Sequence, residues 1–146
     1  MSLIENKKAY FNYEIGEKFD AGIELFGFEV KSIKDKKGSL EGAYIIVRGG
    51  EAYLINAHIP AYQPANAPKD YDPYRNRRLL LTKKELVELS SVEKTKGLTI
   101  VPISVYNKKS KLKLSFGIGR GKKQADKRQS IKKRDTERDL GRTLKS

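Results

Sequence analysis

The residues that could do chemistry near the start of this chain favour contact with anions. Lys7 and Lys8 are followed closely by three aromatic residues, Tyr10, Phe11 and Tyr13. Lysines beside aromatic rings can hold phosphate groups while the rings stack on bases. An edge strand that buries half of these rings in a core would give the same pattern, so the residues leave both alternatives open.

Groups suited to catalysis or cofactor binding are sparse. Nucleic-acid hydrolysis needs carboxylates that hold a divalent metal, or a histidine acting as acid and base. The closest acidic pair before the C-terminal stretch is Asp70 and Asp72, and the single histidine, His58, has no cysteine or second histidine to share a metal with. The glycines from Gly117 lack the apolar helix that follows a dinucleotide fingerprint. We therefore expect no catalytic residue, no metal and no cofactor.

The C-terminal stretch is the most basic part of the chain. Residues 120–146 hold eleven Lys and Arg against four acids, a net +7 out of +13 for the whole chain. Three widely spaced apolar residues cannot form one helical face, so we expect a tail that is disordered alone and helical against a polyanion. A solvated, solubilising tail is the alternative. The release of counterions from phosphates favours nucleic acid.

Length and composition limit the class of protein. The 146 residues suit one domain, 1–119, followed by the tail, 120–146. The chain has no cysteine, no apolar signal core and no apolar run near the roughly 18 residues of a membrane span. This is compatible with the cytoplasm. With a pI of about 9.8, we expect an anionic partner, and a membrane is disfavoured because the tail has no apolar face to enter lipid.

Alternating apolar and polar residues predict several short strands that must position these groups. The Gly49-Gly50 pair predicts a hairpin, because both glycines can take positive φ. Pro102 predicts an edge or a bulge, because it cannot donate to a central ladder. Short strands, frequent turns and few helices predict a mainly β fold, a closed or nearly closed barrel with helices outside it. The expected strands are 19–26, 43–47, 52–55, 98–106 and 112–118.

Two helices and one long loop complete the prediction. Residues 28–34 should form a short helix with a basic face. Thr82 and Glu85 form a capping box, flanked by the Leu81 and Leu86 staple, for a helix that ends near Gly97. The loop 60–78 holds four of the five prolines, with tyrosines and then arginines at its end. That composition suits RNA contact, and a mobile surface loop is the alternative.

Six stretches, taken in order and spacing, carry a family resemblance. They are Asn6-Lys7-Lys8-Ala9, Phe19-Asp20-Ala21-Gly22, Gly27-Phe28-Glu29-Val30-Lys31-Ser32, residues 72–81, Lys96-Gly97-Leu98-Thr99-Ile100-Val101-Pro102 and Gly121-Lys122-Lys123-Gln124-Ala125-Asp126-Lys127-Arg128. The chain resembles the SmpB family, the SsrA-binding proteins of bacterial trans-translation.

The resemblance implies an oligonucleotide-binding-like antiparallel β-barrel, closed or partly open, with outer helices. It implies a non-catalytic adaptor that binds the tRNA-like domain of tmRNA and delivers it to stalled ribosomes. The tail would act in the decoding centre and messenger path. The implied partners are tmRNA, the small ribosomal subunit with its 16S rRNA, and elongation factor Tu through the tmRNA complex.

Candidate contact residues follow from the resemblance and from the basic and aromatic pattern. Asp20 stands where the family usually has Glu, Tyr10-Phe11 replace a usual Arg-His, and Ala125 replaces His or an aromatic residue. The expected tmRNA contacts are Asn6, Lys7, Lys8, Tyr13, Asp20, Lys31, Arg75, Arg77 and Arg78. The expected ribosome contacts in the tail are Gly121, Lys122, Lys123, Asp126, Lys127, Arg128, Lys132, Lys133 and Arg134.

Two other functions compete with the adaptor. A ribosomal protein would also combine a barrel with a basic tail, and binding of free tmRNA would separate the two. A nuclease or RNA-modifying enzyme would have to use Asp70, Asp72 or Tyr74, and the missing acid–base cluster disfavours it.

Overall fold

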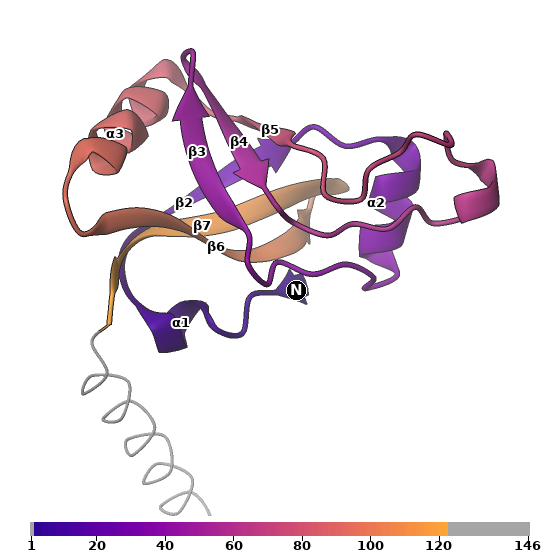
Figure 1. Cartoon of the computed structure of the whole chain (residues 1–146), viewed down its shortest axis with the longest axis horizontal. Helices are drawn as coiled ribbons and strands as arrows, with labels where there is room; N and C mark the ends of the chain where they lie inside the picture. The colour runs from indigo at the N-terminus through magenta and orange to yellow at the C-terminus, as the bar shows by residue number, and fades with distance from the viewer. Residues whose placement is uncertain (1, 123–146) are drawn as a thin grey trace, which may run out of the picture.

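Seven antiparallel strands form the frame of the protein, and short helices lie at its margins (Figure 1). The computed structural model describes residues 2–122. In chain order the elements are β1 (Ser2–Glu5), α1 (Ala9–Asn12), β2 (Tyr13–Ile23), α2 (Gly27–Lys34), β3 (Tyr44–Arg48), β4 (Glu51–Ile55), the 3-10 turn η1 (Pro64–Asn66), β5 (Arg77–Leu80), α3 (Lys83–Lys94), β6 (Leu98–Lys108) and β7 (Lys111–Gly121).

The strands form a single sheet in the order β1-β6-β7-β2-β5-β4-β3. Each neighbouring pair is antiparallel. Every strand contributes buried apolar side chains to one core, together with α2 and α3, so the sheet curves around this core. The mainly β prediction is confirmed, and the barrel is of the partly open kind, with β1 and β3 as its end strands.

Two hairpins follow the sequence prediction. β3 and β4 are joined through Gly49 (φ 60°) and Gly50 (φ 76°), values that a glycine adopts without the Cβ clash of other residues. β6 and β7 pair from Leu98↔Arg120 to Lys108↔Lys111, and the register shifts between Pro102 and Ser104. The predicted bulge at Pro102 is therefore confirmed, in a strand that has neighbours on both sides.

The N-terminal third differs from the prediction. β2 begins at Tyr13 and ends at Ile23, whereas a strand was expected over 19–26. Its first part is mostly polar and gains its pairing from the end of β7, where Tyr13 faces Gly121 and Ile15 faces Gly119. The edge strand considered for 6–13 is wrong, because this stretch holds a turn and α1.

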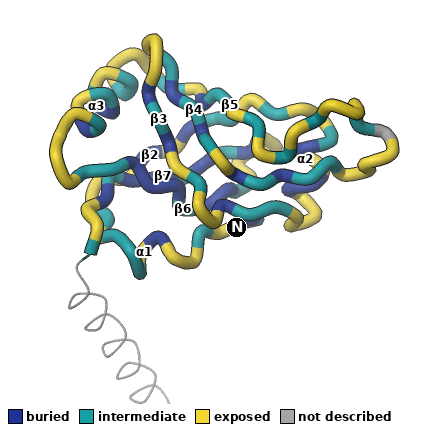
Figure 2. The backbone as a smooth tube through the Cα atoms, in the orientation of Figure 1, coloured by how far each residue is buried: buried dark blue, intermediate teal, exposed yellow. Residues whose placement is uncertain are grey.

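The core lies inside the curved sheet, and Figure 2 shows its buried backbone running through the strands. Phe19 of β2 and Phe116 of β7 stack with centroids 5.5 Å apart. Ile33 of α2 and Leu89 of α3 are fully buried. Both helices thus face the core with one side and solvent with the other, as amphipathic surface helices do.

The start of α3 matches its prediction closely. The Glu85 N–H donates to Thr82 Oγ1 at 3.2 Å, and the Thr82 N–H donates to Glu85 Oε1 at 3.0 Å. Leu81 and Leu86 both pack against the core. This reciprocal cap satisfies backbone donors that a helix N-terminus otherwise leaves unpaired.

The last described residues, 120–122, are attached to the sheet and to α1. β7 runs to Gly121, and the Lys122 N–H donates to the Asn12 carbonyl oxygen at 2.9 Å. Arg120 faces Leu98 and Glu14 in the two ladders. The expected tail contacts from Lys123 to Arg134 lie outside the described residues.

Candidate nucleic-acid interface

A turn between β1 and α1 presents the two N-terminal lysines. Asn6 fixes this turn to the bulge of β6, because its Nδ2 donates to the Pro102 carbonyl at 2.9 Å and its N–H donates to the Ile103 carbonyl at 2.7 Å. Lys7 and Lys8 are exposed on the turn. The structure therefore gives Asn6 a positioning role and leaves the two ammonium groups at the surface.

Lys8 forms one exposed ion pair within the protein. Its Nζ lies 3.0 Å from Glu41 Oε1, and the two side chains are 66% and 70% exposed. Surface ion pairs of this kind contribute between nothing and about 1 kcal/mol, so a phosphate could replace Glu41 as the partner of Lys8 at little cost.

Helix α1 carries an exposed ring beside these lysines. Ala9 is buried and anchors the helix, while Tyr10 is 48% exposed. Lys18 of β2 places its Nζ 5.2 Å from the Tyr10 ring centroid, within cation–π range. Sequence reasoning did not select Lys18 as a contact, because only the pairing of β2 with its neighbours brings it to α1.

The chain leaves β7 at this same corner. Lys122 donates from its N–H to Asn12 and from its Nζ to the Tyr10 carbonyl at 2.8 Å, and Figure 1 shows the last described residues beside α1. Tyr13, partly buried at the start of β2, faces Gly121. The structure brings together the predicted N-terminal contacts and the first residues of the predicted tail.

A hollow of about 220 Å³ opens between α1, the turn before β3 and the bulge of β6. Asn6, Lys8, Asn12, Tyr13 and Glu41 contribute to its lining. It is of modest size, and its amides, phenol and lysine could each form hydrogen bonds with a polar ligand.

Asp20 lies on a different part of the sheet. It is exposed on β2 opposite Ser115 of β7. Burial raises the pKa of Tyr106 above its ordinary value, and the hydrogen bond to the Asp20 carboxylate raises it further. The Tyr106 hydroxyl thus orients this carboxylate, which can accept further hydrogen bonds from a partner.

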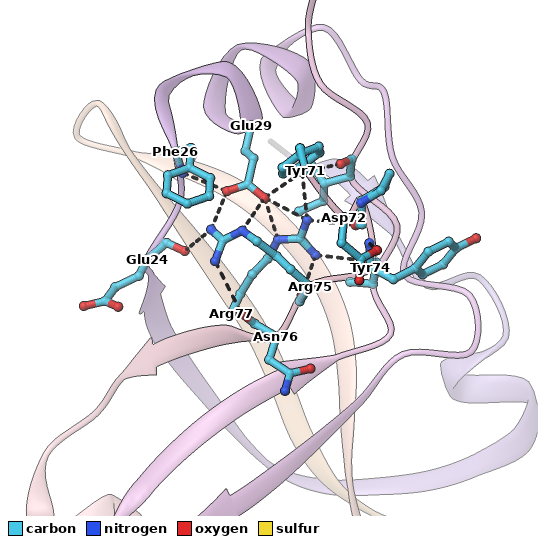
Figure 3. Close-up of polar contacts among 12 residues, drawn as sticks. Glu24, Phe26, Glu29, Tyr71, Asp72, Tyr74, Arg75, Asn76 and Arg77 are labelled. Atoms are coloured by element: carbon cyan, nitrogen blue, oxygen red, sulfur yellow. Dashed lines mark hydrogen bonds and ion pairs between the residues drawn. The ribbon is translucent and has the colours of Figure 1, made fainter. Parts of the chain in front are cut away.

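Arg77 has a different place from the one expected of an RNA contact. It is fully buried, and its Nε and Nη2 lie 2.9 and 2.7 Å from Glu29 Oε2. Nη1 donates to the Ala57 carbonyl at 2.8 Å, and Nη2 also donates to the Pro73 carbonyl at 2.8 Å. With all three nitrogens engaged inside the protein, Arg77 holds the long loop to α2 (Figure 3).

Glu29, on the buried side of α2, is the centre of this cluster (Figure 3). Arg75 binds it through Nη2–Oε1 at 2.5 Å and Nε–Oε2 at 3.1 Å, and the Phe26 N–H donates to Oε1 at 2.7 Å. Burial alone would raise the pKa of Glu29. The hydrogen bonds from Arg75 and Phe26 and the charge of Arg77 outweigh burial, so this pKa is lowered.

Tyr71 closes the cluster from the loop side. Its hydroxyl oxygen lies 2.8 Å from Glu29 Oε2 and 2.6 Å from the Ile59 carbonyl oxygen, and it accepts from Arg77 Nη2 at 3.1 Å. Burial first, and then the neighbouring Glu29 carboxylate, raise the pKa of Tyr71 to about 12. The loop is thus fixed at this end by a network of buried charge-assisted hydrogen bonds.

The remaining predicted contacts are more accessible than Arg77. Arg78 is 38% exposed and pairs with Glu24 Oε1 at 2.7 Å and Glu51 Oε1 at 3.4 Å. Lys31 is exposed in the last turn of α2. The structure therefore separates the predicted set into exposed cations, a turn anchor and the buried arginine cluster.

The described residues offer few groups for metal binding or acid–base catalysis. Residues 2–122 contain no group of three or more His, Cys, Asp or Glu that could hold a metal. Asp72 uses Oδ1 to accept from the Tyr74 N–H at 2.9 Å, a turn-forming role. His58 packs its ring 4.9 Å from that of Tyr74. In the same range, no helix is long and apolar enough to cross a membrane.

Comparisons with known proteins agree on one family. The family model described as SmpB protein matches residues 3–146. An SsrA-binding protein from Microcystis aeruginosa is 46% identical over 143 residues, covering 98% of this chain and 93% of the relative. One from Mesoplasma florum is 52% identical over 133 residues, covering 91% and 89%. A solved structure described as "tmRNA-SmpB: a journey to the center of the bacterial ribosome" has a TM-score of 0.68 at 40% identity, covering 82% of this chain and 84% of that one.

Proposed function

Because this chain belongs to the SmpB family, we propose that it binds the tRNA-like domain of tmRNA and delivers this RNA to stalled ribosomes. It acts there as an adaptor in trans-translation and catalyses no reaction itself. Its site of action is the cytoplasm, on the small ribosomal subunit with its 16S rRNA, and it meets elongation factor Tu through the tmRNA complex.

One observation carries the proposal most directly. Lys7, Lys8 and the exposed Tyr10 lie at the corner where Lys122 leads out of β7. A barrel surface with cations and a stacking ring therefore continues directly into the most basic segment of the sequence. Cations beside aromatic rings suit single-stranded or loop regions of RNA.

The proposed tmRNA contacts are those that the structure leaves accessible. Asp20 offers an oriented carboxylate, and Lys31 and Arg78 offer cations. Asn6 positions the turn that bears the lysines. We do not propose Arg75 and Arg77 as tmRNA contacts, because their guanidinium groups already donate hydrogen bonds to Glu29 and to backbone carbonyls.

The proposed ribosome contacts are the tail residues from Gly121 onward, including Lys123, Asp126, Lys127 and Arg128. This assignment rests on the family and on the net charge of +7 over residues 120–146. Ordering a tail on the ribosome costs roughly 1–2 kcal/mol per residue, which many charge-assisted contacts must offset together.

The test replaces both N-terminal lysines in Lys7→Ala/Lys8→Ala and measures tmRNA affinity over a range of salt. Each lost phosphate contact should reduce the salt slope by about 1, so the double variant should lose about 2. Lys83→Ala/Lys84→Ala is the matched control, because these lysines are exposed in the first turn of α3. Wild-type affinity and slope in the first variant would place the RNA surface elsewhere.

A further inference from the structure

The outward side of α2 is basic and lies between two exposed aromatic rings. Gly27, Lys31 and Lys34 are exposed, while Glu29 and Ile33 face the interior. The exposed positions are four and then three residues apart, so they share one helical face. Phe26 precedes the helix and Tyr62 lies by its far end, where the Lys37 Nζ is 5.5 Å from the Tyr62 ring centroid.

Phe26 is held by several contacts although half of it faces solvent. Its side chain is 50% exposed, the Arg75 Cζ lies 4.1 Å from its ring centroid, and the Phe28 ring is 5.5 Å away. Its N–H is fixed by Glu29. A surface ring that such contacts restrain loses less entropy when a ligand stacks on it than an unrestrained ring would.

Hydrogen bonds hold the Arg75 guanidinium in place over the Phe26 ring. Besides Glu29, its guanidinium donates to the Glu24 carbonyl at 3.3 Å and to the Asn76 carbonyl at 3.3 Å. These bonds hold the guanidinium group over the Phe26 ring. A cation over an aromatic ring is favourable by itself, so this contact helps to keep the ring in place while half of it remains exposed.

The positive charge of residues 31–37 favours an anionic partner. Between Lys31 and Lys37 there are four lysines and one acid, Asp35, which lies 3.5 Å from Lys37 Nζ. An eight-residue helix is about 12 Å long, so the two rings and the lysines between them extend over more than one nucleotide. Aromatic rings interleaved with cations are the pattern by which proteins hold single-stranded nucleic acid.

We propose that the outward face of α2 binds an unpaired stretch of RNA, whose bases stack on Phe26 and Tyr62 and whose phosphates contact Lys31 and Lys34. This rests on the proposed function and adds a second contact surface to it. Figure 1 shows α2 at a distance from α1 along the long axis of the molecule. The RNA at α2 is therefore a different segment from the RNA at the α1 corner.

The absence of tryptophan from the sequence allows a direct optical test. Phe26→Trp keeps a stacking ring and introduces the only tryptophan, which can be excited selectively at wavelengths where tyrosine does not absorb. A short oligouridine, which has no secondary structure, serves as the probe. Stacking should quench this fluorescence, and added salt should weaken the quenching without abolishing it. Val87→Trp is the control, because Val87 is 68% exposed on α3. Binding without quenching at residue 26, or equal quenching at residue 87, would overturn the proposal.

Affinity for the same probe gives a second measure. Phe26→Ala and Phe26→Leu should each weaken binding by at least about fivefold, the lower end for one base–aromatic stack. Val87→Ala should leave it unchanged, and thermal melting checks that each variant is folded. A partner protein in place of RNA would leave oligouridine affinity unaffected by Phe26→Ala, and this outcome also refutes the proposal.

The two proposals fail in different ways. If the α2 surface is wrong, Phe26 variants bind both oligouridine and tmRNA as the wild type does, while Lys7→Ala/Lys8→Ala still loses tmRNA. If the proposed function is wrong, tmRNA is not bound by the wild-type protein at all.

Discussion

Replacing Glu29 by Gln should strongly destabilise the fold. The substitution keeps the shape of the side chain and removes the charge that Arg75 and Arg77 share. Arg77 has no exposed surface, so water cannot replace the lost partner. Breaking a buried ion pair from one side costs about 3–5 kcal/mol. Whole domains are stable by about 5–15 kcal/mol, so Glu29→Gln should be close to the limit of folding.

Urea denaturation measures this loss. With a slope of about 2 kcal/mol per molar urea for a domain of this size, the midpoint should fall by about 1.5–2.5 M. The matched control is Glu41→Gln, which removes a carboxylate from the exposed Lys8 pair and should cost at most about 1 kcal/mol. A similar small shift in both variants would refute the idea that the cluster holds the loop to α2.

Acid provides an independent check on the same residue. The folded-state pKa of Glu29 is lowered, so its contribution to stability is complete above its unfolded pKa of about 4.3. The contribution is lost as the pH falls through the lower folded value. The stability difference between wild type and Glu29→Gln should therefore shrink in acid. A difference that stays constant down to pH 2 would contradict the assigned role.

Three further outcomes are expected. Thr82→Ala should lower the unfolding free energy by about 1 kcal/mol, seen in urea denaturation, with RNA affinity unchanged, because Thr82 caps α3 away from both RNA surfaces. Tyr71, with its pKa raised to about 12, contributes stability below pH 10 that is lost as the pH rises through 12. Among the eight tyrosines, the pKa values of Tyr71 and Tyr106 are both raised, and in an absorbance titration Tyr71→Phe should remove the step near pH 12. A chain ending at Lys122 should stay folded and bind tmRNA in a gel shift yet fail to support tagging in reconstituted translation, and intact tagging would contradict the division of labour between barrel and tail.

Features with local causes could be predicted from the sequence. The α3 cap depends on Thr82 and Glu85, three residues apart, and the β3–β4 hairpin on two adjacent glycines. Neither needs knowledge of distant contacts. The extra length of β2 could not be found in this way, because residues from Tyr13 onward become a strand by pairing with the end of β7, about a hundred positions later. The four residues of α1 are too few to show a helical period.

The arginines of the long loop illustrate the same limit. Arg77 binds Glu29 and Ala57, which are 48 and 20 residues away, so composition alone indicated a surface cation. The sequence Arg77-Arg78-Leu79-Leu80 shows no alternation of polar and apolar residues. The period-two burial that places Arg77 and Leu79 on the core side of β5 is therefore visible only in the structure.

The cluster around Glu29 is unequal in charge. It contains two guanidinium groups and one carboxylate, and the phenol of Tyr71 remains neutral because its pKa is about 12. The cluster thus carries an excess positive charge, to which backbone carbonyls present their dipoles. Dissolved ions cannot approach Arg77 closely because it is fully buried, so its field is screened less than that of the surface lysines. RNA held against α2 should therefore retain a part of its attraction in high salt, where contacts that depend on counterion release have largely been lost.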